Sequence, residues 1–88
     1  MTFNEGLKLM FNFTIVDTLT GENMGSIKAD TIYHAANIAL STRGPIVEAT
    51  EIAPGVFDCL AWPSVEAAEN DDGARAVYRG MLRVTQND

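Results

Sequence analysis

The chain has 88 residues, of which 47% are hydrophobic and 20% charged, and its formal net charge is −6 at pH 7. This length and composition fit one globular domain over residues 1–88 and exclude a disordered tail. The negative charge disfavours direct binding to nucleic acid or to an anionic membrane, because Lys and Arg supply the affinity for both. The longest apolar run has four residues, at 59–62, whereas a membrane-spanning helix needs about 20.

Targeting and redox features are sparse. Residues 1–6 lack a basic segment followed by an apolar one, so we expect no secretory signal. We also expect these residues to form a frayed end. Cys59 is the only cysteine, which excludes an internal disulfide and fits a reducing compartment. We therefore expect a cytoplasmic protein.

Alternating hydrophobicity predicts a β-hairpin in the first third of the chain. Every second residue between 7 and 15 is apolar, which is typical of a strand with one buried face. The residues expected on that face are Leu7, Leu9, Phe11, Phe13 and Ile15. Residues 17–23 have turn chemistry, and a second strand is expected over 24–29 with Ile27 and Ala29 facing inward.

An alanine-rich helix is predicted over residues 31–43. Its apolar positions recur with helical spacing; they are Ile32, Ala35, Ala36, Ala39 and Leu40. Asp30 or Thr31 suits the N-cap, Arg43 suits the last turn, and Gly44 suits a left-handed C-terminal cap. Because alanine is small, we expect the helix to lie close against a sheet.

Residues 46–52 and 56–62 predict a second hairpin around the turn Ala53-Pro54-Gly55. The 56–62 strand is apolar on both faces except at one position, which suggests an interior place in the sheet. Ser64 is suited to cap a single helical turn over 65–69.

From residue 74 the periodicity fits two structures. As a strand, the inward residues are Ala76, Tyr78, Gly80, Leu82 and Val84. As a helix, the apolar stripe is Ala74, Val77, Tyr78, Met81 and Leu82. A glycine inside a helix costs about 1 kcal/mol, and the β-branched and aromatic residues favour the strand. The predicted fold class is α+β, an antiparallel or mixed sheet of about five strands in the order ββαβββ with one α-helix packed on one face.

His34 and Cys59 are the only residues of their types, and neither has the neighbours that catalysis needs. His34 follows Asp30 by four residues, which would suit a base oriented by a carboxylate, but no nucleophile can be placed beside it. Cys59 lies in an apolar strand next to Asp58, and both features oppose thiolate formation. One His and one Cys are too few for a structural zinc site. We expect no catalytic residues, no metal and no cofactor.

The uneven charge is the most informative feature. Residues 44–74 hold seven acids and no Lys or Arg. The acids, which we predict to bind a partner, are Glu48, Glu51, Asp58, Glu66, Glu69, Asp71 and Asp72. A solvated face that keeps the protein soluble is the alternative interpretation. Trp62, within this stretch, is either a core residue or an exposed binding anchor. Three arginines, Arg75, Arg79 and Arg83, follow the acidic stretch.

The general plan resembles a class of small inhibitors. A hairpin with Thr20-Gly21-Glu22 at its tip, an alanine-rich helix opened by Ala29-Asp30-Thr31, and further strands in a short acidic chain are similar to phage-encoded inhibitors such as anti-CRISPR proteins. This resemblance of architecture, size and charge implies a protein that blocks a nucleic-acid-binding site of a host complex.

We therefore predict a non-enzymatic binding protein or inhibitor, monomeric or homodimeric. Its partner would be a basic protein or nucleoprotein complex, contacted through an acidic surface. The alternative function is a structural or assembly subunit that self-associates through its sheet face or a sheet edge.

Overall fold

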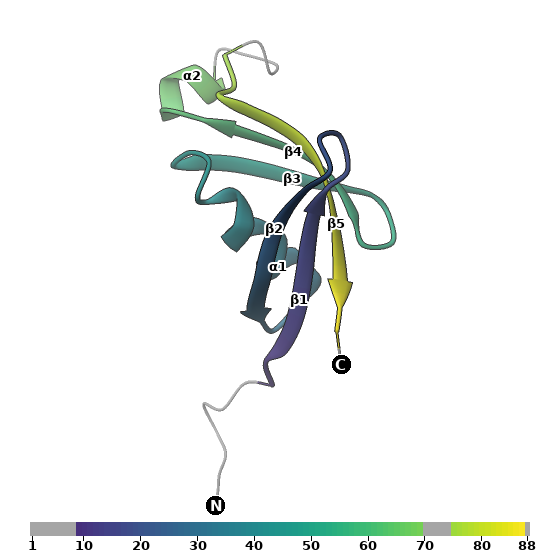
Figure 1. Ribbon diagram of the computed structural model, residues 1–88. Coiled ribbons are helices and arrows are strands. Elements are labelled where there is room, and N and C mark those ends of the chain that lie inside the picture. Colours follow the sequence, from purple (N-terminus) through teal and green to yellow (C-terminus); the bar gives the residue numbers. More distant parts are fainter. Residues whose placement is uncertain (1–8, 70–74, 88) are drawn as a thin grey trace, which may run out of the picture.

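The structure, a computed structural model, describes residues 9–69 and 75–87. These residues form a five-stranded antiparallel sheet in the order β2-β1-β5-β4-β3 and two short helices (Figure 1). The strands are β1 (Phe11–Asp17), β2 (Glu22–Ala29), β3 (Ile46–Ala53), β4 (Val56–Trp62) and β5 (Tyr78–Gln86). The helices are α1 (Ile32–Leu40) and α2 (Val65–Glu69).

The α+β class is confirmed, and every strand pair is antiparallel. The predicted order ββαβββ is wrong, because α2 lies between β4 and β5. Ser64 caps this helix as expected, since its hydroxyl accepts a hydrogen bond from the Ala67 amide at 3.2 Å. The predicted frayed end at 1–6 lies outside the described residues.

The last strand, β5, joins the two hairpins into one sheet. Its first half pairs with β4 from Tyr78 to Arg83, and its second half pairs with β1 from Leu82 to Gln86. Figure 1 shows β5 running beside β4 and then beside β1 towards the C-terminus. The ambiguous segment is thus a strand, as preferred from the sequence. The order of the strands leaves β2 and β3 at the two edges.

Helix α1 covers one face of the sheet, which we call the helix face. Successive strand residues point to opposite faces, so the core takes alternate residues from each strand. The buried core residues from the strands are Phe13, Ile15, Ala29, Phe57, Cys59, Leu82 and Val84. They pack against Ala35, Ala36, Ala39 and Leu40 of the helix. Small helix residues let the backbone of α1 lie close to the sheet, as the sequence suggested.

The observed boundaries of α1 and β1 differ from the predicted ones, as do the starts of β2, at Glu22 and not 24, and of β5, at Tyr78 and not 74. Helix α1 ends at Leu40, short of residue 43, and Gly44 is not among the described glycines with positive φ. Gly44 is needed for space, because a Cβ atom there would lie 2.9 Å from the carbonyl oxygen of Trp62. Strand β1 starts at Phe11, and Leu9 is 78% exposed, so its predicted inward place is wrong. Leu7 lies outside the described residues.

A buried carboxylate marks the point where β1 leaves β5. The Asp17 side chain is 1% exposed and accepts hydrogen bonds from the Tyr78 hydroxyl at 2.5 Å and the Leu19 amide at 3.0 Å. A third, longer bond comes from the Met81 amide at 3.4 Å. A Cβ atom at Gly80 would overlap the Tyr78 hydroxyl and lie 2.9 Å from Asp17 Oδ2. Glycine is therefore required at position 80 so that the tyrosine can lie along the strand.

These contacts shift two pKa values in opposite directions. Burial alone would raise the pKa of Asp17, but the hydrogen bonds from Tyr78, Leu19 and Met81 outweigh it and lower the pKa below 3.8. Burial raises the pKa of Tyr78, and the hydrogen bond to Asp17 raises it further. The pair is therefore a neutral phenol that donates to a carboxylate at neutral pH.

Replacing Tyr78 with Phe should destabilise the protein by about 1–3 kcal/mol, because the substitution removes one donor from a buried carboxylate. Chemical denaturation followed by circular dichroism measures this change. Tyr33→Phe is the comparison, since its hydroxyl also donates to a carboxylate, that of Glu51, but Tyr33 is 54% exposed. Water can replace the lost donor there, so we expect a smaller loss, less than about 1 kcal/mol. Equal effects of the two substitutions would contradict a special role for the buried pair.

The lowered pKa of Asp17 predicts a stability difference that depends on pH. A carboxyl group with a lowered folded-state pKa stabilises the fold above its unfolded pKa, and this contribution is lost as pH falls through the folded pKa. Asp17→Asn should therefore be less stable than the wild type at neutral pH, and the difference should shrink as pH falls below about 4. Denaturation curves across this range measure it, with the exposed Asp58→Asn as the charge-matched control. A constant difference would contradict the prediction.

Candidate interaction surface

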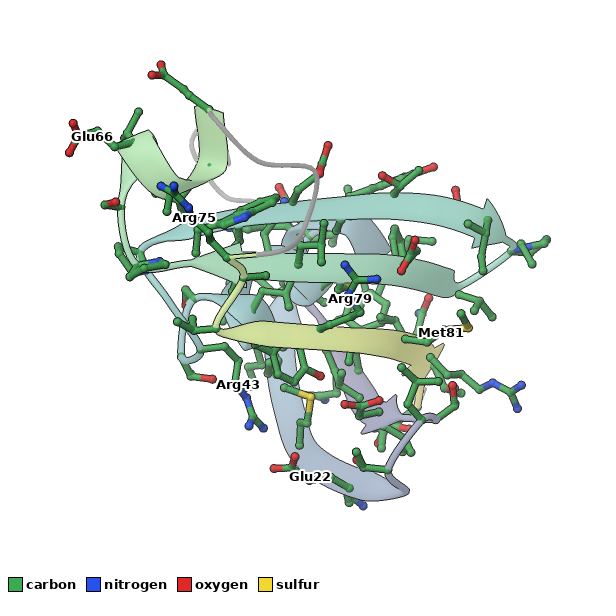
Figure 2. All side chains as sticks on the ribbon, turned by 90° about the horizontal axis from the view of Figure 1, so that it is seen from above. Glu22, Arg43, Glu66, Arg75, Arg79 and Met81 are labelled. Atoms are coloured by element: carbon green, nitrogen blue, oxygen red, sulfur yellow. The ribbon has the colours of Figure 1, made fainter. Side chains whose placement is uncertain are left out.

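The face of the sheet opposite α1 carries charges of both signs on β3, β4 and β5. We call it the open face, because α1 packs against the other face. Glu48 of β3 and Asp58 of β4 lie on it, and both are exposed. Arg79 and Arg83 of β5 lie on the same face by strand alternation. Between them lies Met81, which is half-buried (Figure 2).

The strand register places the acidic and the basic side chains of this face next to one another. Asp58 is directly opposite Met81, so Arg79 and Arg83 are its diagonal neighbours on β5. Arg79 itself faces Leu60, and Arg83 faces Val56. Within residues 9–69 and 75–87, neither arginine forms an ion pair. The open face thus presents two carboxylates, one on β3 and one on β4, next to the two arginines of β5.

Glu51 lies on the opposite side of β3 from Glu48, because the two differ by an odd number of strand residues. Its carboxylate accepts the Tyr33 hydroxyl of α1 at 2.5 Å and the Gly55 amide at 3.0 Å. The Tyr33 bond is the larger cause of a lowered Glu51 pKa, and in return it raises the pKa of Tyr33. Glu51 therefore ties the end of β3 to the helix while half-exposed to solvent.

The remaining predicted acids belong to α2 and its following segment. Glu66 and Glu69 are exposed on α2, and Glu66 projects away from the sheet (Figure 2). Asp71 and Asp72 lie outside the described residues. Trp62, at the end of β4, is 5% exposed, which makes it a buried residue and excludes the exposed-anchor interpretation.

The structure thus separates the five described acids of the 44–74 stretch into three places. Two lie on the open face, one lies on the helix face, and two lie on α2. All three places belong to β3, β4 and the helix that contacts β4, so they surround one half of the sheet. They form no single flat patch, and β4 is the strand that contacts both β3 and α2.

The two edge strands differ in how they are protected. Strand β2 has a register irregularity opposite Ile15/Val16, Gly25 with a φ of 95°, and α1 packed against it. Arg43 also reaches Glu22, the first residue of β2, at 2.7 Å. Strand β3 pairs regularly with β4 from Ile46 to Glu51. Bulges and covering elements are common protections of sheet edges. Strand β3 has a register irregularity only at its end, between Glu51 and Ala53, and α1 contacts it as well. From Ile46 to Glu51, however, it has neither a bulge nor a Lys or Pro.

Sequence reasoning did not identify this edge, because strand order depends on pairing between distant segments. The sequence gives only one indirect signal. Strand β3 has one Glu at an even position and one at an odd position, so that both of its faces carry a negative charge, and it has no base. Such charge is unusual for an interior strand.

The candidate catalytic residues have simple structural roles. His34 is exposed, and its Nδ1 atom lies 2.9 Å from Asp30 Oδ1, so the expected pairing is present. The Thr31 hydroxyl, the N-cap of α1, accepts a hydrogen bond from the His34 backbone amide at 3.1 Å. Cys59 is fully buried, and burial raises its pKa to about 11, which makes a thiolate at neutral pH rare.

Within residues 9–69 and 75–87, no cluster of three or more His, Cys, Asp or Glu side chains is placed to hold a metal ion. Of the helices in that part of the chain, neither is long and apolar enough to cross a membrane. Comparison with protein-family models, curated proteins and solved structures gave no match for this chain.

Proposed function

We propose that this chain is a non-enzymatic binding protein that contacts a basic partner through the carboxylates around β3 and β4. The observation that carries this proposal is the availability of those charges. Glu48, Asp58 and Glu69 are exposed, and they form no ion pair within the described residues. Glu48 and Glu69 therefore keep their attraction for an external cation, whereas that of Asp58 is partly offset by Arg79 and Arg83, its diagonal neighbours.

The partner class follows from the sign of the charge. Exposed clusters of Lys and Arg are typical of proteins that handle nucleic acids, because such clusters neutralise phosphates. A protein that covers such a cluster with carboxylates would exclude the nucleic acid, and it would act as an inhibitor. Electrostatic attraction would accelerate the encounter, and buried apolar contacts would supply most of the affinity.

The arginines of β5 support specificity in this proposal. Arg79 and Arg83 would repel a uniformly basic surface if it approached the centre of the sheet. They would leave the β3 side accessible, where the described strand residues carry acids and no base. Such repulsive elements distinguish one binding orientation from another.

A tagged pull-down from a lysate of the encoding organism tests the proposal when the charges are varied. The test variant neutralises four acids of the acidic stretch: Glu48→Gln, Asp58→Asn, Glu66→Gln and Glu69→Gln. The control variant makes the same change in net charge elsewhere: Glu5→Gln, Glu22→Gln, Asp30→Asn and Asp88→Asn. Circular dichroism confirms that both variants fold.

We expect the wild type and the control variant to retain the same basic, nucleic-acid-binding protein at about 0.1 M salt. The test variant should lose it by at least tenfold, and high salt should release it from the wild type. Equal capture by both variants would contradict a role for these carboxylates.

A second candidate function is an assembly subunit that self-associates through the open face. The observation that favours it is that Asp58 lies next to Arg79 and Arg83 on this face. In a symmetric dimer, Asp58 of each copy could pair with these arginines of the other copy. Light scattering at micromolar to millimolar concentration measures this. Under the first proposal we expect a monomer. A dimer that Asp58→Arg abolishes and that Asp58→Arg with Arg79→Asp restores would favour assembly.

A further inference from the structure

Strand β3 is a sheet edge whose outer backbone groups have no partner in the described structure. Its eight residues, Ile46–Ala53, pair only with β4. No other described backbone hydrogen bond involves residues 46–53. An unpaired edge of this length can accept a further strand, because its outward N–H and C=O groups repeat at the spacing that an extended chain requires.

The edge carries carboxylates on both of its faces. An added strand would lie about 4.7–4.9 Å from β3, and its side chains would alternate between the two faces of the sheet. Residues opposite Glu48 would lie on the open face, and residues opposite Glu51 on the helix face. Opposite-charge pairs across strands stabilise pairing, and like-charge pairs destabilise it. The edge therefore favours an incoming strand with Lys or Arg on both of its faces.

The same charges disfavour a second copy of this chain at the edge. Two β3 strands side by side would bring Glu48 and Glu51 of both copies to one seam, and β3 contains no base to compensate. Self-pairing through β3 is therefore opposed by like charges, although the backbone geometry permits it.

Apolar side chains at the end of the edge add a place for a partner residue. A shallow hollow is lined by Glu51, Ile52, Ala53 and Pro54. Ile52, at the register irregularity near the end of β3, is 54% exposed. A strand with apolar residues between its bases would cover this isoleucine and gain affinity from the buried area.

We propose that β3 binds an extended basic segment of a partner protein as an additional antiparallel or parallel strand. This inference rests on the proposed function, because it specifies how the carboxylates around β3 meet a basic partner. Main-chain hydrogen bonds would supply affinity, and Glu48 and Glu51 would select the sequence.

The test is a nuclear magnetic resonance titration of the full chain with three blocked nine-residue peptides. The first alternates Val and Lys, the second alternates Val and Glu, and the third repeats the Val/Lys sequence with every second backbone amide N-methylated. With the first peptide we expect shift changes and slower hydrogen exchange at the β3 amides. The amides of β2, the protected edge, serve as the internal control and should not change.

The second and third peptides should bind at least tenfold more weakly than the first. Glu48→Gln should weaken the first peptide severalfold, because Glu48 is exposed and forms no ion pair in the described residues. Glu69→Gln is the matched control, because it removes the same charge from an exposed residue of α2, and it should have less than a twofold effect.

Two results would overturn strand addition. One is equal binding of the N-methylated peptide, and the other is no slowing of exchange along β3. Either result would leave the proposed function standing if the four-acid variant still lost its captured partner in the pull-down. If that variant kept its partner while the Val/Lys peptide paired with β3, the edge would be established and the proposed function contradicted.

Discussion

The pairing of β5 with both hairpins is the interaction on which the rest of the structure depends. Each hairpin is local in sequence, and each alone is a marginal two-stranded unit. One sheet exists only because the last strand pairs with β4 along its first half and with β1 along its second half. This arrangement fixes the edges as well, because the inner strands of both hairpins are occupied and β2 and β3 remain outside.

The Asp17–Tyr78 pair stabilises the place where β5 changes partners. At this place β1 ends, and the Asp17 carboxylate accepts the Met81 amide while the Thr18 amide donates to the Met81 carbonyl oxygen at 2.7 Å. A buried charge is costly unless hydrogen bonds satisfy it. The three donors to Asp17 meet this condition, and Gly80 leaves the space that one of them needs. Local satisfaction of one carboxylate thus supports the long-range pairing.

Much of the local structure could be predicted from the sequence. The two hairpins, the alanine stripe of α1 and the Ser64 cap follow from periodicity and capping chemistry between near neighbours. The strand order could not be predicted, because it depends on contacts between residues about 60 positions apart, such as Asp17 and Tyr78. Gly80 could be recognised as unfavourable in a helix, but its reason, the tyrosine lying over it, is visible only in three dimensions. Leu9 continues the apolar alternation of β1, although the pairing that would bury it stops at Phe11.

The acidic residues, too, are arranged differently in the fold than in the sequence. The acids of residues 44–74 form one stretch in the sequence, but strand alternation sends Glu48 and Glu51 to opposite faces of the sheet. A flat partner surface could meet only some of them at once. An extended strand beside β3 could meet both, because its own side chains alternate in the same way.

The carboxylates of β3 have a further consequence for the isolated protein. A sheet edge that is regular over most of its length, as β3 is from Ile46 to Glu51, is prone to pair with any other extended chain, including another copy. Positive charge is the common protection of such edges, but negative charge repels a second copy equally well. The two signs of charge differ in their effect on basic chains, which an edge with lysines would repel and an edge with carboxylates would attract. The sign of the protecting charge therefore opposes self-pairing of β3 and, in the binding proposed above, favours a basic segment.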